Sequence, residues 1–267
     1  MSTLHLIRLP ISLSALARWA ASRNYGWTTR RDKKGSERDA GFDEGCAIHH
    51  LLVETFGKGA LHPFRMLVAS PGKQGHVYAY SRADAATLLE IAQACALPEV
   101  AGVCDLAQLA AKSMPETWRA GRRLGFETRV RPVSRLMKPL PHSGGNAFAK
   151  GAELDVFLIE AMRRFPEATS AEENMLKAGR SREAVYTDWL AQKLEGIATL
   201  APGVRLARFV RNRAARTGHA PEGPDATLQG DLIVDDPLRF QDSLANGLGR
   251  HKAYGYGMLL LRPPRST

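Results

Sequence analysis

The order of apolar patterns in the first 95 residues constrains the fold more than any other feature of this sequence. Leu4–Ile11 alternates apolar and polar side chains, which is typical of a strand. Cys46–Phe56 has helical apolar spacing and follows two acidic residues that suit the positive end of a helix dipole. Two strand-like runs, His62–Ser70 and Gly75–Arg82, flank a Pro-Gly turn, and Ala83–Cys95 is again helical. This order predicts most of a ferredoxin-like βαββαβ unit.

The rest of the chain predicts a second domain of the same kind. Phe126–Pro132 alternates and is expected to close the first sheet. The other expected elements are helices at Gly151–Phe165, Ser181–Glu195 and Pro237–Leu248, and strands at Val204–Arg216, Thr227–Val234 and Tyr254–Leu261. The predicted fold class is α+β, with two ferredoxin-like (RRM-like) domains in tandem. Their expected bounds are 1–135 and 181–267, separated by a linker and helical insertion at 136–180.

The excess of basic side chains indicates a polyanionic partner. The 267 residues include 37 Lys+Arg against 27 Asp+Glu, a formal net charge of +10. Cations that neutralise phosphates release condensed counterions, which favours binding to nucleic acid. A solvated basic surface or an anionic membrane would suit the same charge, so charge alone leaves the partner open. Part of the excess lies in one glycine-containing stretch, at Arg23, Arg30, Arg31, Lys33, Lys34 and Arg38.

Several classes of protein are disfavoured. The three cysteines, Cys46, Cys95 and Cys104, lack zinc-ligand spacing and cannot all pair, which indicates a reduced, cytoplasmic compartment and no metal. No apolar run approaches the roughly 18 residues that span a bilayer. The first 31 residues contain arginine but no Asp or Glu, as transit peptides do, but the alternation at Leu4–Ile11 favours a strand of the folded domain.

A glycine-rich segment near the C-terminus is the most informative stretch for function. Four glycines, Gly247, Gly249, Gly255 and Gly257, surround the basic triplet Arg250-His251-Lys252. Glycines allow backbone amides to converge on an anion, and the cations add charge-assisted hydrogen bonds. The segment lacks the Gly-Lys-Ser/Thr ending of a P-loop and leads into a strand, not a helix, which disfavours a nucleoside triphosphatase. Turns and bulges also need glycine, and a metabolic enzyme that binds a nucleotide here remains an alternative.

This segment resembles a known family. Gly247-x-Gly249-x-x-Lys252-x-x-Gly255-x-Gly257 before an apolar strand is similar to the C-terminal glycine-rich loop of the repeat-associated RNA-binding (RAMP) superfamily, and within it to CRISPR repeat-processing endoribonucleases of the CasE type. Three further runs resemble the family's first helix, its Phe-x-Leu-Arg-x-Asn-Pro strand and its central helix, namely Ile48–Phe56, Phe126–Pro132 and Tyr186–Leu194. The long first connection and the 136–180 segment depart from the family and suggest a divergent member, plausibly of a type IV system.

The resemblance implies an endoribonuclease that needs neither metal nor cofactor. Its 2′-OH attack would cut repeat RNA at the base of a hairpin and leave a 2′,3′-cyclic phosphate and a 5′-OH. The implied partners are CRISPR repeat RNA, the retained mature guide RNA and other subunits of a CRISPR effector complex, with no membrane. A non-cleaving subunit that holds guide RNA as a scaffold is the alternative.

Two catalytic schemes are open. By the helix resemblance His49 would be the base or acid, with His50 about 100° further round the helix. Alternatively, Arg23 and Arg38 would act by electrostatics, with Tyr25 holding the scissile nucleotide. The alternatives without a catalytic role are that His49 or His50 is an ordinary half-buried helix histidine, and that Arg23 and Arg38 belong to a solvated basic face. The residues expected to bind RNA are Arg30, Arg31, Lys33, Lys34, Arg129, Arg131, Arg211, Arg213, Gly247, Gly249, Arg250, His251, Lys252, Gly255 and Gly257.

Overall fold

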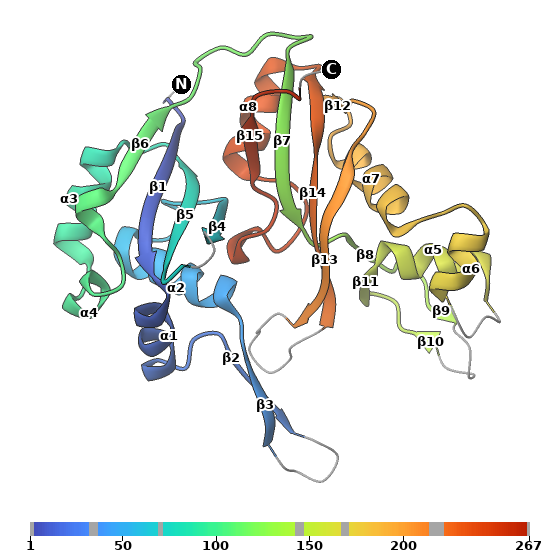
Figure 1. Cartoon of the computed structure of the whole chain (residues 1–267), viewed down its shortest axis with the longest axis horizontal. Coiled ribbons are helices and arrows are strands. Elements are labelled where there is room, and N and C mark those ends of the chain that lie inside the picture. The colour runs from blue at the N-terminus through green and yellow to red at the C-terminus, as the bar shows by residue number, and fades with distance from the viewer. Residues whose placement is uncertain are drawn as a thin grey trace. The chain divides into compact units, whose positions relative to one another are not determined.

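A computed structural model describes residues 3–31, 37–68, 72–141, 147–166, 171–213 and 222–265. Contacts within the chain divide it into two compact units (Figure 1). The first unit comprises Met1–Trp118, Arg213–Glu222 and Pro237–Leu259, and the second comprises Arg119–Asn212, Gly223–Asp236 and Leu260–Thr267. The contacts therefore group the chain differently from the expected domain bounds. In particular, the glycine-rich segment belongs with the N-terminal elements.

The first unit contains a complete βαββαβ arrangement. Its elements are β1 (His5–Ser12), α2 (Glu44–Phe56), β4 (Phe64–Val68), β5 (Gln74–Ser81), α3 (Ala85–Cys95) and β6 (Ala110–Ser113). The sheet order is β4-β5-β1-β6, and every neighbouring pair is antiparallel. Both the element order and the strand order are those of a ferredoxin-like domain.

The closing strand of this sheet is β6, so the expectation that Phe126–Pro132 closes it is wrong. The four residues of β6 are all exposed and read Ala-Ala-Lys-Ser, which has no apolar alternation to reveal it. Phe126 instead lies in the second unit, where it pairs with Gly230. A strong alternating pattern identified a strand correctly but not the sheet to which the strand belongs.

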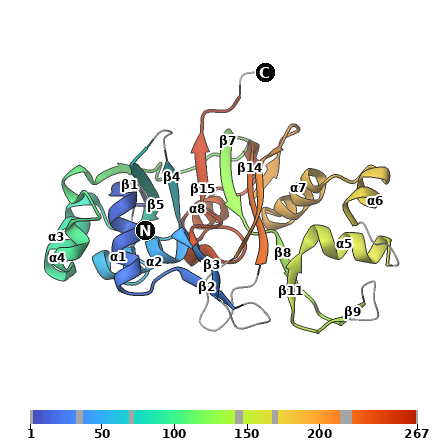
Figure 2. The same cartoon turned by 60° about the horizontal axis from the view of Figure 1, so that its bottom comes forward.

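The basic stretch after the first helix forms a hairpin (Figure 2). It lies between α1 (Leu13–Ser22) and α2, with β2 (Trp27–Arg31) antiparallel to β3 (Glu37–Phe42). Arg30 lies opposite Arg38 in the register. Their side chains and that of Arg31 are outside the described part of the structure, as are Lys33 and Lys34 entirely. The remaining elements of this unit are α4 (Pro98–Ala101), η1 (Leu106–Gln108), α8 (Pro237–Asn246) and η2 (Lys252–Tyr254).

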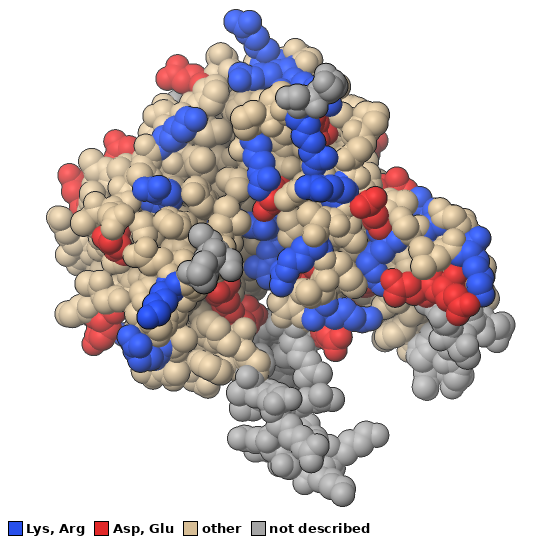
Figure 3. All heavy atoms as spheres, in the orientation of Figure 1, with Lys and Arg blue, Asp and Glu red and all other residues tan. Residues whose placement is uncertain are grey.

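The second unit is built on a five-stranded antiparallel sheet. Its strands are β12 (Ala198–Leu200), β14 (Glu222–Val234), β7 (Arg123–Val130) and β15 (Leu259–Arg262) in that order, with β13 (Arg205–Arg213) also paired to β14. Along the chain, β7, α7 (Arg182–Lys193), β13, β14, α8 and β15 repeat the βαββαβ plan. Lys and Arg side chains gather over β7, β13 and β14 (Figure 3). The fold is therefore α+β, with two ferredoxin-like plans in tandem, as predicted.

Residues between β7 and α7 form the helical insertion of the second unit. It contains α5 (Val156–Arg164), α6 (Ala171–Lys177) and the short pairs β8 (Val133–Arg135) with β11 (Glu153–Asp155) and β9 (Leu140–Pro141) with β10 (Ala147–Phe148). Leu136, Leu140 and Ile159 form its own small core. The helix expected from Gly151 begins only at Val156, because Glu153–Asp155 pairs as a strand with β8.

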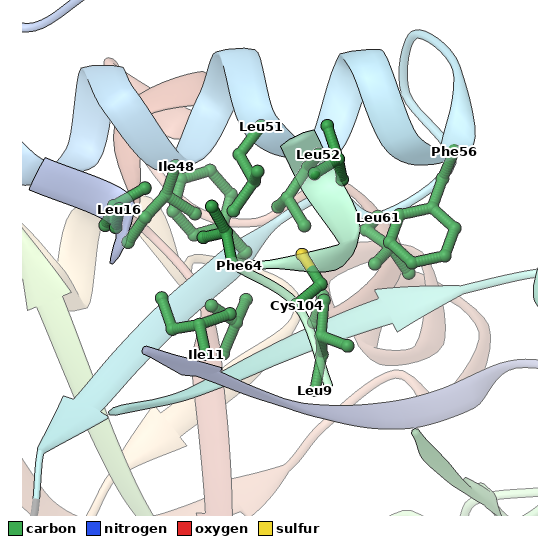
Figure 4. Close-up of a cluster of buried hydrophobic side chains, with 14 of the residues drawn as sticks. Leu9, Ile11, Leu16, Ile48, Leu51, Leu52, Phe56, Leu61, Phe64 and Cys104 are labelled. Carbon is green, nitrogen blue, oxygen red and sulfur yellow. The ribbon is translucent and has the colours of Figure 1, made fainter. Parts of the chain in front are cut away.

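The main core of the first unit lies between α2 and its sheet (Figure 4). Ile48, Leu51 and Leu52 point from the helix toward Leu9 and Ile11 of β1. All five side chains are at most 4% exposed. Burial of a side chain of this size contributes roughly 1.5–3 kcal/mol. The packing fixes the rotation of α2 about its axis, and with it the direction of every other side chain on the helix.

Candidate active site

The rotation of α2 leaves His49 and His50 half-buried and outside the core cluster. Their surroundings differ. The His50 ring stacks on Tyr25, with centroids 4.0 Å apart and planes inclined by 8°. The His49 ring meets Tyr254 edge-on, with centroids 5.5 Å apart. His50 is therefore held against Tyr25, shortly after the end of α1, and His49 is held against Tyr254 of the glycine-rich segment.

That segment, residues 247–257, forms a closed loop that we call the glycine loop. Its four glycines and His251 all have φ between +60° and +81°, a region that favours glycine. The Leu248 N–H donates to the Gly257 carbonyl at 2.8 Å, which joins the two ends of the loop. A Cβ on Gly257 would overlap the Leu248 carbonyl oxygen, so this position admits no other residue without movement of the backbone.

The glycine loop packs directly on α2 and on the segment before β4. A Cβ on Gly45 would overlap the Tyr254 carbonyl oxygen, so the first turn of α2 touches the loop backbone. At Gly247 a Cβ would lie 3.0 Å from Pro63, and at Gly255 it would lie 3.1 Å from the Phe64 ring. The structure thus brings His49 and the loop together within one unit, although 198 positions separate Gly247 from His49 in the sequence.

His62, which the sequence interpretation did not single out, lies in the same cluster. It is half-buried, and burial followed by the positive charge of Lys252 lowers its pKa from the ordinary 6.5. Burial also lowers the pKa of His49, and His50, His62 and Lys58 lower it further. No local pattern marks His62, because its surroundings come from tertiary contacts between distant segments.

Glu54 lies one turn beyond His50 on α2 and contacts Arg23 and Tyr25, two of the predicted site residues. The Arg23 Nε lies 3.5 Å from a Glu54 carboxylate oxygen, and the Arg23 guanidinium lies 5.3 Å from the centre of the Trp19 ring. Burial raises the pKa of the Tyr25 hydroxyl, and a hydrogen bond to Glu54 raises it further. Arg23 and Tyr25 are therefore placed beside His50. The side chain of Arg38, the other member of the arginine scheme, lies outside the described residues.

The basic triplet of the loop presents three different surroundings. Arg250 is exposed and Lys252 is half-buried. His251 is only 8% exposed and meets the Tyr256 ring edge-on, with centroids 6.4 Å apart. Of the three, Arg250 and Lys252 are thus accessible to a ligand.

Two arginines expected to bind phosphate are used inside the second unit. Arg129 donates two hydrogen bonds to Asp225, at 2.8 and 2.6 Å. Arg131 is 3% exposed, and it donates to the Asn212 carbonyl at 3.3 Å. Strand alternation placed both arginines on one face correctly, but it did not reveal the carboxylate of Asp225 on the same face. Arg211 is exposed on β13, and only the backbone of Arg213 is described.

The described residues hold no group of three or more His, Cys, Asp or Glu side chains arranged to bind a metal ion. Among the same residues, no helix combines the length and the apolar character needed to cross a membrane.

The fold and the site together define a class of protein: tandem ferredoxin-like proteins in which a C-terminal glycine loop packs on a histidine-bearing helix, here α2. The chain belongs to the CRISPR associated protein family, whose model matches residues 4–263. No curated protein matches the sequence.

Solved structures share this fold over the full chain. Cse3 of Thermus thermophilus, bound to an RNA representing a pre-cleavage complex, has 17% identity and a TM-score of 0.60, covering 98% of this chain and 100% of that one. The CRISPR endoribonuclease Cse3 bound to a 19 nt RNA has 18% identity and a TM-score of 0.59, with the same coverage. Cas6e from Escherichia coli K-12 has 17% identity and a TM-score of 0.54, covering 97% and 99%.

Proposed function

We propose that this chain is a metal-independent endoribonuclease that cuts CRISPR repeat RNA at the base of a hairpin and then retains the guide RNA within an effector complex. The observation that carries the proposal is the packing of the glycine loop on α2, with Tyr254 against His49. A histidine able to transfer protons and a loop of glycines and cations able to bind phosphate share one surface.

The reaction needs a base, an acid and cations. The 2′-OH loses its proton to the base as O2′ bonds to phosphorus. The bond from phosphorus to O5′ then breaks, and the acid gives a proton to O5′. Cations and backbone amides stabilise the negative charge that develops on the phosphate oxygens. His49 supplies one of the proton transfers, while the accessible side chains of Lys252 and Arg250, with the loop amides, bind the phosphate.

The family and the RNA-bound structures of the same fold support RNA as the partner. An A-form stem has a deep, narrow major groove, so most contacts to it are made with phosphates and 2′-hydroxyls. Exposed arginines such as Arg211 and Arg250 suit such contacts. Other subunits of a CRISPR effector complex are the expected protein partners.

The test is to incubate the purified protein with an end-labelled repeat hairpin in EDTA and to identify the product ends by mass spectrometry. We expect one cut at the hairpin base, with a 2′,3′-cyclic phosphate on the upstream product. A hairpin with a single 2′-deoxy substitution at the attacking ribose should bind with similar affinity and stay intact. Tight binding without any cut would instead identify a non-cleaving guide-RNA scaffold.

Three variants then rank the two catalytic schemes. If histidine carries the reaction, His49→Gln loses far more activity than Arg23→Gln or Arg38→Gln. If the arginines carry it by electrostatics, the order is reversed. Affinity for the 2′-deoxy hairpin, measured for all three, separates a loss of chemistry from a loss of binding.

A further inference from the structure

His62 lies on a segment that two other parts of the first unit hold in place. Its backbone N–H donates to the Tyr80 carbonyl at 3.1 Å, and the Tyr80 N–H donates to the Pro63 carbonyl at 3.1 Å. The buried Tyr80 hydroxyl also donates to the Leu259 carbonyl at 2.9 Å, just beyond the glycine loop. Because the loop itself packs on Pro63 and Phe64, the segment that carries His62 is held beside the loop.

The His62 side chain is accessible. It lines a cavity of about 310 Å³ within the first unit, together with Arg82 and Asn246. This volume is at the lower end of the range for pockets that bind small ligands. Asn246 directly precedes the glycine loop, so this cavity adjoins the first residue of the loop.

Charged and titratable groups face the two histidines unequally. Lys252 of η2 and Arg82 of the cavity wall lie near His62, and Lys252 carries a permanent charge that disfavours imidazolium there. His49 faces His50, His62 and Lys58. Repulsion from His50 and His62 acts only when those rings are themselves protonated, and Lys58 makes the smallest contribution. The positive charge of Lys252 therefore favours the neutral form of His62, which is the form that a general base needs.

We infer that His62 is a catalytic residue, the general base of the proposed reaction, and that His49 is the general acid. The inference rests on the proposed function. His62 takes the 2′-OH proton as the O2′–P bond forms, and His49 gives its proton to O5′ as the P–O5′ bond breaks. Lys252, beside the base, binds a non-bridging oxygen of the same phosphate. Solvent then returns both rings to their starting protonation.

The test measures single-turnover cleavage of the repeat hairpin in EDTA by wild type, His62→Gln and His49→Gln. His76→Gln is the matched control, because His76 is a half-buried histidine of β5 in the same unit and is not part of the cluster. Removal of a general acid or base typically costs about 10²–10⁴-fold. We expect both cluster variants to fall by this amount and the control to match wild type.

A second substrate assigns the roles. In a hairpin whose 5′-bridging oxygen is replaced by sulfur, the leaving thiolate needs no proton. This substrate should restore most of the activity of His49→Gln and none of that of His62→Gln. The cleavage rate of the wild type should rise with pH as the general base is deprotonated. The rate of His62→Gln should not rise in this way, because that base has been removed.

The outcomes separate the two claims. Cleavage by His62→Gln at the wild-type rate, or its rescue by the sulfur substrate, would overturn the inference and leave the endoribonuclease intact. A wild-type protein that never cuts would contradict the proposed function instead. If His62→Gln binds the 2′-deoxy hairpin poorly, His62→Ala with added imidazole replaces it, and a rate that rises with imidazole supports the base.

Discussion

The sheet of the second unit and the histidine cluster of the first unit (His49, His50 and His62) both contain basic side chains. The two groups differ in whether those side chains are paired with carboxylates. In the sheet, the carboxylates of Asp225, Asp231 and Glu127 are only 1–6% exposed, and each accepts from an arginine of a neighbouring strand. In the first unit, His49, His50 and His62 are half-buried, and burial lowers the pKa of each. Arg123, Arg129 and Arg262 are thus committed to ion pairs within the sheet, whereas the histidines of the cluster remain able to exchange protons.

This difference teaches that the net charge of +10 is a poor guide to where RNA binds. Figure 3 shows basic side chains gathered over β7, β13 and β14, yet Arg123 and Arg129 of β7 are paired with the buried carboxylates of Asp231 and Asp225. A buried pair of this kind is costly to break, because either partner alone is left charged in a desolvated place. These paired arginines are therefore expected to contribute mainly to stability, and the cluster mainly to chemistry.

The largest expected effect is that of His49→Gln on catalysis. The rate of repeat cleavage should fall by about 10²–10⁴-fold, because one proton transfer is lost. The free energy of unfolding should change little, since His49 lies outside the core. Single-turnover kinetics and urea denaturation measure the two quantities. If His49→Gln instead lost much of its stability while cleavage stayed unchanged, the role of the histidine cluster would be structural, like that of the ion pairs in the sheet.

Asp225→Ala tests the opposite region. It leaves the Arg129 guanidinium, 20% exposed, without its bidentate partner, and the free energy of unfolding should fall by about 3 kcal/mol. Cleavage should persist at temperatures where the variant is folded. The control is Asp188→Ala, which removes a 61%-exposed carboxylate bound to Arg180 and should cost under about 1 kcal/mol. If the two variants lost the same free energy of unfolding, the buried ion pairs of the sheet would be no more important for stability than an exposed pair, which would contradict the comparison.

Gly257→Ala should loosen the glycine loop from within. The new Cβ meets the Leu248 carbonyl oxygen at a φ of +81°, so we expect a loss of about 2 kcal/mol in the free energy of unfolding and weaker RNA binding. Gly121→Ala is close in φ, at +77°, but its Cβ meets nothing within 4 Å, and Gly121 lies in the second unit. That control should cost only about 1 kcal/mol and leave RNA binding unchanged.

The smallest effect is the pH dependence of stability. The three histidines have folded-state pKa values below 6.5, so the unfolded chain binds protons first as the pH falls. The free energy of unfolding should therefore decrease as the pH drops below 6.5 toward the folded-state values, and stay level above that point. Urea denaturation between pH 7.5 and pH 5.5 measures it. The slope should be shallower in His62→Gln than in the wild type.

Local patterns predicted the elements better than they predicted their pairing. The sequence placed β1, α2, β5 and α3 to within a few residues, because apolar spacing is a property of consecutive positions. It missed β6, which is short and exposed, and assigned Phe126–Pro132 to the wrong sheet. Pairing depends on contacts between distant residues, which spacing does not encode.

The candidate site shows the same division. The prediction singled out His49 and the glycine loop from motifs that resemble a family. It did not find His62, because only folding brings Lys252 and His49 near it. It chose Arg129 as a phosphate ligand without its partner Asp225, which lies 96 positions later in the chain.

The most direct test of the central claim is an NMR titration of the whole chain with the uncleavable 2′-deoxy repeat hairpin. If one phosphate site is shared by α2 and the glycine loop, the ring Cε1–H signals of His49 and His62 and the amides of residues 247–257 should shift together and saturate at the same RNA ratio. Shifts confined to residues of the second unit, with these signals unmoved, would contradict the account.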